Sequence, residues 1–394
     1  MFWLLKKYCC AKIYVMGKKI LGWFKTNIIF TIVVAVVIVS CFIVPIDKGY
    51  INYFEGSGTT LTCIFGILII VAGLENIDFF QKVARFLVKK FKNTRTIILT
   101  LIFITYVSSL INANDMALLT FLPLSFIVLK YTGQTKYMAF TFVMQNIASN
   151  LGGMFSPIGN PQNIYLFTFY NIGLLEFFKI MAIPTLCALV LIVVCCMFVK
   201  KEPIEFADEY NHKLNLPKLI TYLVLFVLTF LVVCEVLPFY IVLPILIVTM
   251  LICDRKTFFK IDYTIILTFV AFFIFSGNMS RIPVVQEFMT NFADGSTFLC
   301  AYLSCQLISY VPTSILLSRF TSNYPALLVS VNVASLGIIF SSLSGLIALK
   351  CFAKYNNKEE SKHGTWYYIG VDLLMNIVLL VILYPVSYFS LMLI

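Results

Sequence analysis

Long apolar runs without a charged residue restrict the fold of this chain more than any other feature of its sequence. Hydrophobic residues make up 61% of the 394 residues and charged residues 12%, whereas soluble domains have about 45–50% and about 25%. A helix needs about 20 apolar residues to cross a bilayer. The sequence therefore predicts an all-α polytopic membrane protein. The runs are 26–46, 59–74, 96–111, 116–129, 137–169, 180–199, 219–234, 239–253, 263–280, 298–318 and 324–349, followed by an apolar tail from Trp366.

The Lys and Arg residues alternate between the two sides of these runs. Segments 1–25, 75–95, 130–136, 200–218, 253–262 and 350–365 hold 25 of the 29 basic residues. By the positive-inside rule these segments are cytoplasmic. This places the N-terminus in the cytoplasm and the C-terminus outside. The membrane that we expect is the plasma membrane. The net charge of +11 is then a topology signal and gives no support to nucleic-acid binding, because no basic domain could line a groove.

Two stretches are too irregular to be simple transmembrane helices, and two others are divided into arms that are short for a membrane crossing. Run 137–169 has 33 uncharged residues with Asn, Gln, Gly and Pro at its centre, which is typical of a broken helix. The arms of 298–318, joined by Tyr-Val-Pro, cannot cross about 30 Å of hydrocarbon. We interpret this stretch as a re-entrant hairpin, and 96–129, joined by Asn-Ala-Asn-Asp, as another. Segment 324–349 is the second broken helix.

This order of elements predicts an inverted repeat, the architecture of secondary transporters. After a basic N-terminus at 1–25, the first repeat covers 26–199, with hairpin 96–129 and broken helix 137–169. A cytoplasmic loop and linking helix at 200–238 lead to the second repeat, 239–394, with hairpin 298–318 and broken helix 324–349.

Asp115 is the one acid clearly inside the apolar stretches, and it follows Asn112 and Asn114. A carboxylate in the membrane is costly and marks a functional site by default. We expect it to bind a coupling cation or to carry a proton, with the two Asn residues as oxygen donors. The alternative is an ordinary surface loop. Glu75, Asp78, Glu235, Arg319 and Asp372 lie at span ends and are interpreted as interfacial.

The broken helices could bind an anion at the N-terminus of a half-helix or a cation at freed carbonyls. A proline kink with Asn caps, and serines that only pack, are the structural alternatives. The predicted substrate-binding residues are Asn150, Gly153, Ser156, Pro157, Asn160, Asn163, Thr313, Ser314 and Ser341. The predicted coupling-ion residues are Asn112, Asn114, Asp115, Gly152, Ser309 and Asn332.

Two strings carry a family resemblance. Asn-Asp-Met-Ala-Leu-Leu-Thr-Phe-Leu-Pro-Leu at 114–124 and Asn-Leu-Gly-Gly-Met-Phe-Ser-Pro-Ile-Gly-Asn-Pro-Gln-Asn at 150–163 resemble the ion transporter superfamily. This superfamily includes arsenite permeases, citrate transporters and divalent anion–sodium symporters. The resemblance implies substrate between the hairpin tips and broken helices, a homodimer, and elevator-like motion. In the second half it departs at Tyr310, where such hairpins usually carry Asn.

We therefore expect secondary transport of a small inorganic or carboxylate anion coupled to H⁺ or Na⁺, with no cofactor beyond that ion. Sodium/proton antiport without an organic substrate is the alternative. Energy from ATP would need a separate subunit, because the chain has no GxxxxGK[ST] motif. A passive channel and an intramembrane enzyme are disfavoured. Both histidines, His212 and His363, lie in predicted loops, and no paired carboxylates are available for acid–base chemistry.

Overall fold

The protein is described here by a computed structural model. It covers residues 28–45, 57–79, 82, 93–111, 114–203, 215–233, 236–261, 263–339, 342–356 and 364–393. Within these ranges every regular element is a helix, and the β structure is limited to one isolated bridge between Asn93 and Pro203. The all-α prediction is confirmed. The predicted basic N-terminus, 1–25, lies outside the described residues.

The chain divides into two compact units, and the first consists of residues 1–55 and 262–286. Its described helices are α2 (Ile28–Ile43) and α12 (Tyr263–Ser280), which pack against each other. Asn278 Nδ2 donates a hydrogen bond to Ser40 Oγ at 2.8 Å, and Ser40 Oγ donates to the Val37 carbonyl at 2.7 Å. These bonds join two helices at buried polar side chains, which would otherwise be costly to bury.

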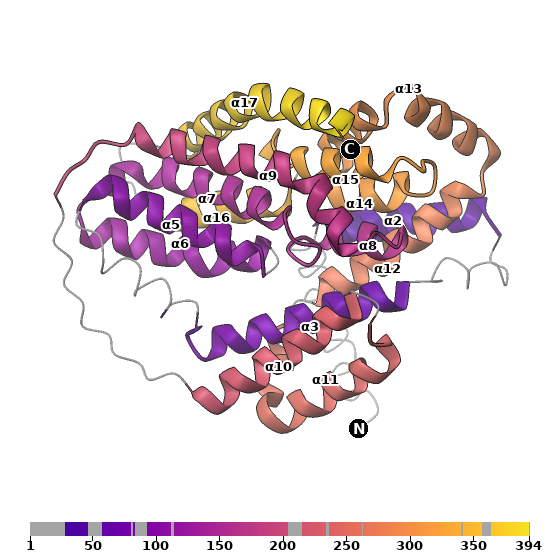
Figure 1. The fold of residues 1–394 in the computed structure, drawn as a ribbon, viewed down its shortest axis with the longest axis horizontal. Helices are drawn as coiled ribbons and strands as arrows, with labels where there is room; N and C mark the ends of the chain where they lie inside the picture. The colour runs from indigo at the N-terminus through magenta and orange to yellow at the C-terminus, as the bar shows by residue number, and fades with distance from the viewer. Residues whose placement is uncertain are drawn as a thin grey trace, which may run out of the picture. The chain divides into compact units, whose positions relative to one another are not determined.

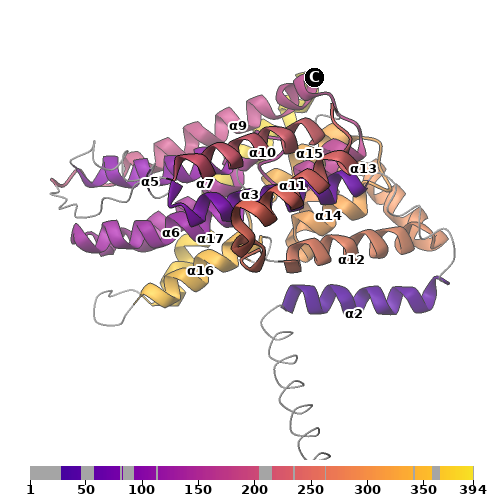
Figure 2. The same ribbon diagram turned by 90° about the horizontal axis from the view of Figure 1, so that it is seen from below.

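The second unit, residues 56–261 and 287–394, holds the elements that matter for function. Helices α5, α6 and α7 pack together, α3 packs on α10 and α11, and α17 packs on α9 and α7 (Figures 1 and 2). The helices are α3 (Ser57–Asn76), α5 (Thr94–Ser109), α6 (Asn114–Tyr131), α7 (Met138–Gly153), α8 (Pro161–Phe169), α9 (Leu174–Met197), α10 (Leu216–Val233), α11 (Phe239–Asp254), α13 (Pro283–Ile308, which starts in the first unit), α14 (Tyr310–Leu317), α15 (Tyr324–Val333), α16 (Leu343–Tyr355) and α17 (Thr365–Ser390).

The helices are interrupted inside all four stretches predicted to be irregular. The interruptions separate α5 from α6, α7 from α8, α13 from α14 and α15 from α16. Local sequence explains one of these interruptions, and an unusual backbone conformation marks another. Pro161 begins α8 at the first helical position, where its missing N–H costs nothing. Ser309 divides α13 from α14 with a φ of +72°, a conformation that a non-glycine residue rarely adopts. The re-entrant path of the hairpins and the inverted repeat remain predictions.

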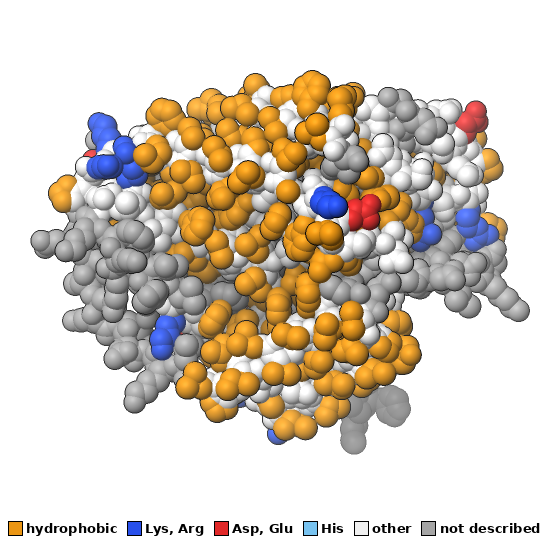
Figure 3. Space-filling model, viewed as in Figure 1, with side chains coloured by type: hydrophobic (Ala, Val, Ile, Leu, Met, Phe, Trp, Pro, Cys, Tyr) orange, Lys and Arg blue, Asp and Glu red, His pale blue; other side chains and the backbone are white. Residues whose placement is uncertain are grey.

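The outside of the second unit is apolar. Three helical stretches are each long and apolar enough to cross a membrane: Gly58–Asn76, Leu174–Met197 and Thr365–Leu393. Leu186 and Val190 of α9 and Val381 of α17 are more than half exposed. Figure 3 shows hydrophobic side chains over most of the visible face, with charged groups in a few small patches. A surface of this kind suits lipid as its surroundings.

Predicted cytoplasmic segments come together at two places in this unit. At the first, Lys136 Nζ and Gln134 Nε2 donate to the Glu202 carboxylate at 2.8 and 2.9 Å. The hydrogen bonds from Lys136 and Gln134 lower the pKa of Glu202, and the bond to Glu202 raises the pKa of Lys136. The Thr94 N–H at the start of α5 also donates to the Glu202 carbonyl, at 2.9 Å. Three segments with basic residues therefore meet at one place, as expected if they share a membrane face.

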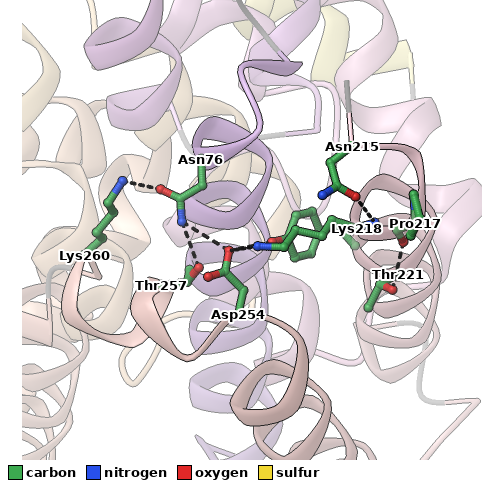
Figure 4. Close-up of polar contacts among 9 residues, drawn as sticks. Asn76, Asn215, Pro217, Lys218, Thr221, Asp254, Thr257 and Lys260 are labelled. Carbon is green, nitrogen blue, oxygen red and sulfur yellow. Dashed lines mark hydrogen bonds and ion pairs between the residues drawn. The ribbon is translucent and has the colours of Figure 1, made fainter. Parts of the chain in front are cut away.

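The second meeting place joins α3, α10 and α11 around Asp254 (Figure 4). Asp254 Oδ2 accepts a hydrogen bond from the Tyr222 hydroxyl at 2.8 Å and lies 3.3 Å from Lys218 Nζ. Asn76 Nδ2, at the end of α3, donates to Thr257 Oγ1 at 2.9 Å, and its Oδ1 accepts from Lys260. These contacts hold the predicted cytoplasmic ends of α3, α10 and α11 together. Which membrane face they occupy remains a prediction.

Candidate functional site

The tips of the two predicted hairpins and the first broken helix meet through one buried amide. Asn114, the first residue of α6, donates from Nδ2 to Asn150 Oδ1 in α7 at 2.7 Å and to the Tyr310 hydroxyl at 3.0 Å. Tyr310 is the first residue of α14. The three residues are 0–3% exposed. Side chains more than 190 positions apart in the sequence thus share hydrogen bonds inside the protein.

The two broken helices meet through Asn332 of α15. Its Oδ1 accepts from Asn160 Nδ2 at 3.1 Å and from Gln162 Nε2 at 3.2 Å. Its Nδ2 donates to Asn163 Oδ1 at 2.7 Å and to the Leu328 carbonyl at 2.8 Å. All four hydrogen-bonding positions of a buried amide are therefore used, and three of the four partners are side chains from the region where α8 begins.

Asn150 joins these two sets of contacts. Its Oδ1 accepts from Ser344 Oγ, near the start of α16, at 3.0 Å, and its main-chain carbonyl accepts from Asn160 Nδ2 at 3.2 Å. We call the connected set the central amide cluster. It consists of Asn114, Asn150, Asn160, Gln162, Asn163, Tyr310, Asn332 and Ser344.

Two glycines at the end of α7 make this approach possible. A Cβ on Gly153 would lie 2.2 Å from Asn160 Oδ1, and one on Gly152 would lie 2.4 Å from the Tyr106 carbonyl oxygen. Real Cβ atoms do not come so close to their neighbours. Both glycines were predicted as ligand-binding residues; in the structure Gly153 allows the close packing of the cluster, and Gly152 allows α7 to pack closely on α5.

Helix ends of both polarities surround the cluster. Helices α6, α8, α14 and α16 begin at the four interruptions, and α5, α7, α13 and α15 end there. A helix N-terminus carries unpaired N–H groups and about half a positive charge, and a C-terminus carries unpaired carbonyls and about half a negative charge. The arrangement can therefore offer donors to an anion and oxygen ligands to a cation at the same place.

Two oxygens of the cluster are left without a hydrogen bond. Asn160 Oδ1 and Gln162 Oε1 are buried, and neither has a partner among the described residues. A buried acceptor without a donor is unfavourable, and in native structures it calls for a ligand or another explanation. The two oxygens suit a bound cation or a ligand with a hydrogen-bond donor. Within the described part of the chain, no His, Cys, Asp and Glu side chains are grouped to hold a metal ion.

The other predicted substrate residues have local partners. Thr313 Oγ1 and Ser314 Oγ donate to carbonyls of Ser309 and Tyr310 one turn earlier, both at 2.8 Å. Ser156 accepts from the Ile158 N–H at 3.3 Å, beside the buried Pro157.

Three predicted residues fall wholly or partly outside the description. Asn112 and Ser341 lie outside the described residues. Asp115 belongs to α6, but its side chain is not among those described. The roles of these three residues in ion and substrate binding remain predictions.

Three residues of the central amide cluster and one other buried residue were not predicted as site residues from the sequence. Gln162, Tyr310 and Ser344 belong to the central amide cluster, and the polar, Gly- and Pro-rich context of each was the available signal. Asp372, interpreted as interfacial, is 1% exposed within α17, which packs on α7 and α9. Asp372 lies only seven residues past the start of α17, so the sequence alone suggests the membrane surface.

The described elements are all helices, the exterior is apolar, and interrupted helices meet in a buried polar cluster. This is the architecture of a membrane transporter. The citrate transporter family matches residues 13–344, and the chain belongs to this family. It is 30% identical to an uncharacterized transporter of Methanocaldococcus jannaschii, over 74% of this chain and 80% of that protein. It is 27% identical to the inner membrane protein YbiR of Escherichia coli, over 74% and 79%. The protein is a transporter and not an enzyme, and the predicted superfamily resemblance is confirmed.

Proposed function

We propose that the protein is a secondary active transporter that moves a small inorganic or carboxylate anion across the plasma membrane, coupled to H⁺ or Na⁺. The observation that carries this proposal is the convergence of four helix N-termini, those of α6, α8, α14 and α16, on the central amide cluster. Their N–H groups and dipoles favour negative charge. Because the described side chains of the cluster are uncharged, the substrate charge must be stabilised mainly by these main-chain groups.

The coupling ion follows from the oxygens in the same region. Asn160 Oδ1 and Gln162 Oε1 lack partners among the described residues, and α7 and α15 end in the same region. A cation held there would offset the charge of an anion bound nearby, so that each ion improves the binding of the other. Asp115, next to Asn114 at the start of α6, is the predicted charged member of this ion site.

The transport cycle is proposed from the family resemblance together with the chain's own elements. The hairpins and broken helices would move as one transport region, in an elevator-like motion, against a frame that includes the Asp254 contacts of α3, α10 and α11. A homodimer would hold the frame in the membrane. The N-terminus would face the cytoplasm and the C-terminus the outside.

The test uses purified full-length protein in liposomes with a panel of labelled citrate, succinate, sulfate and arsenite. Imposed pH and sodium gradients are varied separately. Saturable uptake of one anion that follows one gradient supports the proposal. Sodium–proton exchange without movement of any anion would instead establish the antiport alternative, and a current proportional to voltage would establish a pore.

Asp115→Asn is the matched variant for the coupling role. We expect it to abolish gradient-driven uptake while the protein remains folded, because the amide cannot release a proton or neutralise a cation. Unchanged uptake by this variant would remove Asp115 from the mechanism.

A further inference from the structure

A buried carboxylate lies in the C-terminal helix α17, outside the central amide cluster. Asp372 is 1% exposed. It is the eighth residue of α17, about 10 Å along the axis from Thr365 at a rise of 1.5 Å per residue. A 26-residue helix is about 39 Å long, longer than the hydrocarbon layer of about 30 Å. Asp372 therefore lies within the span.

The surroundings of Asp372 are polar, and the described residues place no positive charge among them. The side-chain amides of Asn146 in α7 and Asn376 in α17 lie beside the carboxylate. Tyr368, one turn earlier, is fully buried with its ring stacked on Phe352 at 4.7 Å between centroids. Asp372 Oδ1 and the Tyr368 hydroxyl are both buried without a hydrogen-bond partner among the described residues.

The helices packed against α17 supply no counter-charge to this position. Helices α7 and α15 contain no charged residue. The charged residues of α9, Glu176 and Lys179, are exposed near its start, and Lys350 and Lys354 of α16 are exposed. The titratable neighbours that remain are Tyr368 itself and Cys351 of α16, which acts on Tyr368. Burying an ionised carboxylate without a cation is strongly unfavourable. A proton on Asp372 removes that cost.

We propose that Asp372 is a proton-binding site through which the transporter takes up and releases its coupling proton. A sodium ion fits less well, because a cation of that kind needs several oxygen ligands, whereas the structure places two amide side chains, those of Asn146 and Asn376, beside the carboxylate. The proposal rests on the proposed function, and it adds a specific proton carrier on a helix that none of the sequence motifs marked.

A short path of amides links Asp372 to the central amide cluster. Asn146 Oδ1 accepts from Asn150 Nδ2 at 3.3 Å, and Asn150 Oδ1 accepts from Asn114 and Ser344. An ionised Asp372 can only accept hydrogen bonds, so it favours the donor side of the Asn146 amide. A protonated Asp372 can donate, so it competes with Asn150 for Asn146 Oδ1. Proton binding would thereby alter the hydrogen bonds of Asn150, which contacts residues of the first predicted hairpin and of both broken helices.

Infrared titration of the purified full-length protein in detergent tests the site without any substrate. We expect a protonated-carboxyl band that changes with pH in the wild type, is absent in Asp372→Asn, and persists at a shifted frequency in Asp372→Glu. Glu287→Gln, which removes an exposed carboxylate of α13, is the matched control and should leave the band unchanged. The inference is overturned if wild type and Asp372→Asn, both folded by circular dichroism, give the same titration. If Asp372→Asn does not fold, the absence of the shifted band in Asp372→Glu overturns the inference.

A second measurement separates this inference from the proposed function. Liposomes containing the protein and filled with the pH dye pyranine are given citrate, succinate, sulfate or arsenite outside. The wild type should move protons with one of these anions and Asp372→Asn should not. Proton movement by folded Asp372→Asn at the wild-type rate would overturn the inference. A titrating band at Asp372 without proton movement on any anion would uphold the proton site and count against anion–proton coupling.

Discussion

Substitution of Asn332 by alanine tests whether the central amide cluster holds the interrupted helices together. The change removes the acceptor of Gln162 Nε2 and the donor to Asn163 Oδ1, and both partners are buried. Asn160 Nδ2 keeps its bond to the Asn150 carbonyl. A buried polar group left without a partner costs about 1–3 kcal/mol. Two such groups should lower the free energy of unfolding by about 2–6 kcal/mol.

The assay is chemical unfolding of the full-length protein in detergent micelles, followed by circular dichroism. Ser125→Ala is the control, because Ser125 Oγ of α6 is buried without a partner among the described residues. Its removal leaves no group unsatisfied, so stability should change by less than about 0.5 kcal/mol or should rise. The reasoning fails if the two variants unfold at the same denaturant concentration.

Four further substitutions have expected outcomes in the same assay. Gly153→Ala should destabilise by about 1–3 kcal/mol through overpacking, whereas Gly370→Ala, in an open helical position, should stabilise by up to about 1 kcal/mol. A stabilising Gly153→Ala would contradict the close packing at α7. Tyr310→Phe should cost about 1 kcal/mol, because Asn114 loses one acceptor and keeps another. Asp254→Asn should cost about 1–3 kcal/mol, and the difference should shrink in high salt; a salt-independent loss would show that the neighbouring ammonium contributes nothing.

The positions of the helix interruptions could be predicted from the sequence because they follow from local chemistry. Gly152, Gly153, Pro157 and Pro161 disfavour a continuous helix wherever the chain goes. The short arms of hairpin 298–318 gave the other signal, since their length is fixed by the rise of a helix. Features that depend only on backbone conformation and helix length could therefore be predicted from the sequence.

The partners of the polar side chains could not be predicted in the same way. An amide can pair with any other amide, and Asn332 takes its partners from residues about 170 positions earlier. Gln162 was not singled out because nothing local distinguishes it from its neighbours. Tyr310 was noted as a departure from the family pattern, and its hydroxyl bonds to Asn114. The burial of Asp372 could not be predicted, because packing by other helices leaves no local mark in the sequence.

The hydrogen bonds among the interrupted helices also bear on how tightly the proposed site would hold a solute. Asn114, Asn150 and Asn332 each already have hydrogen-bond partners within the central amide cluster. A solute must replace existing bonds with equally good ones, so its net gain on entry is small. In the proposed transport cycle, such an exchange would let the cargo leave the site again, which favours rapid turnover.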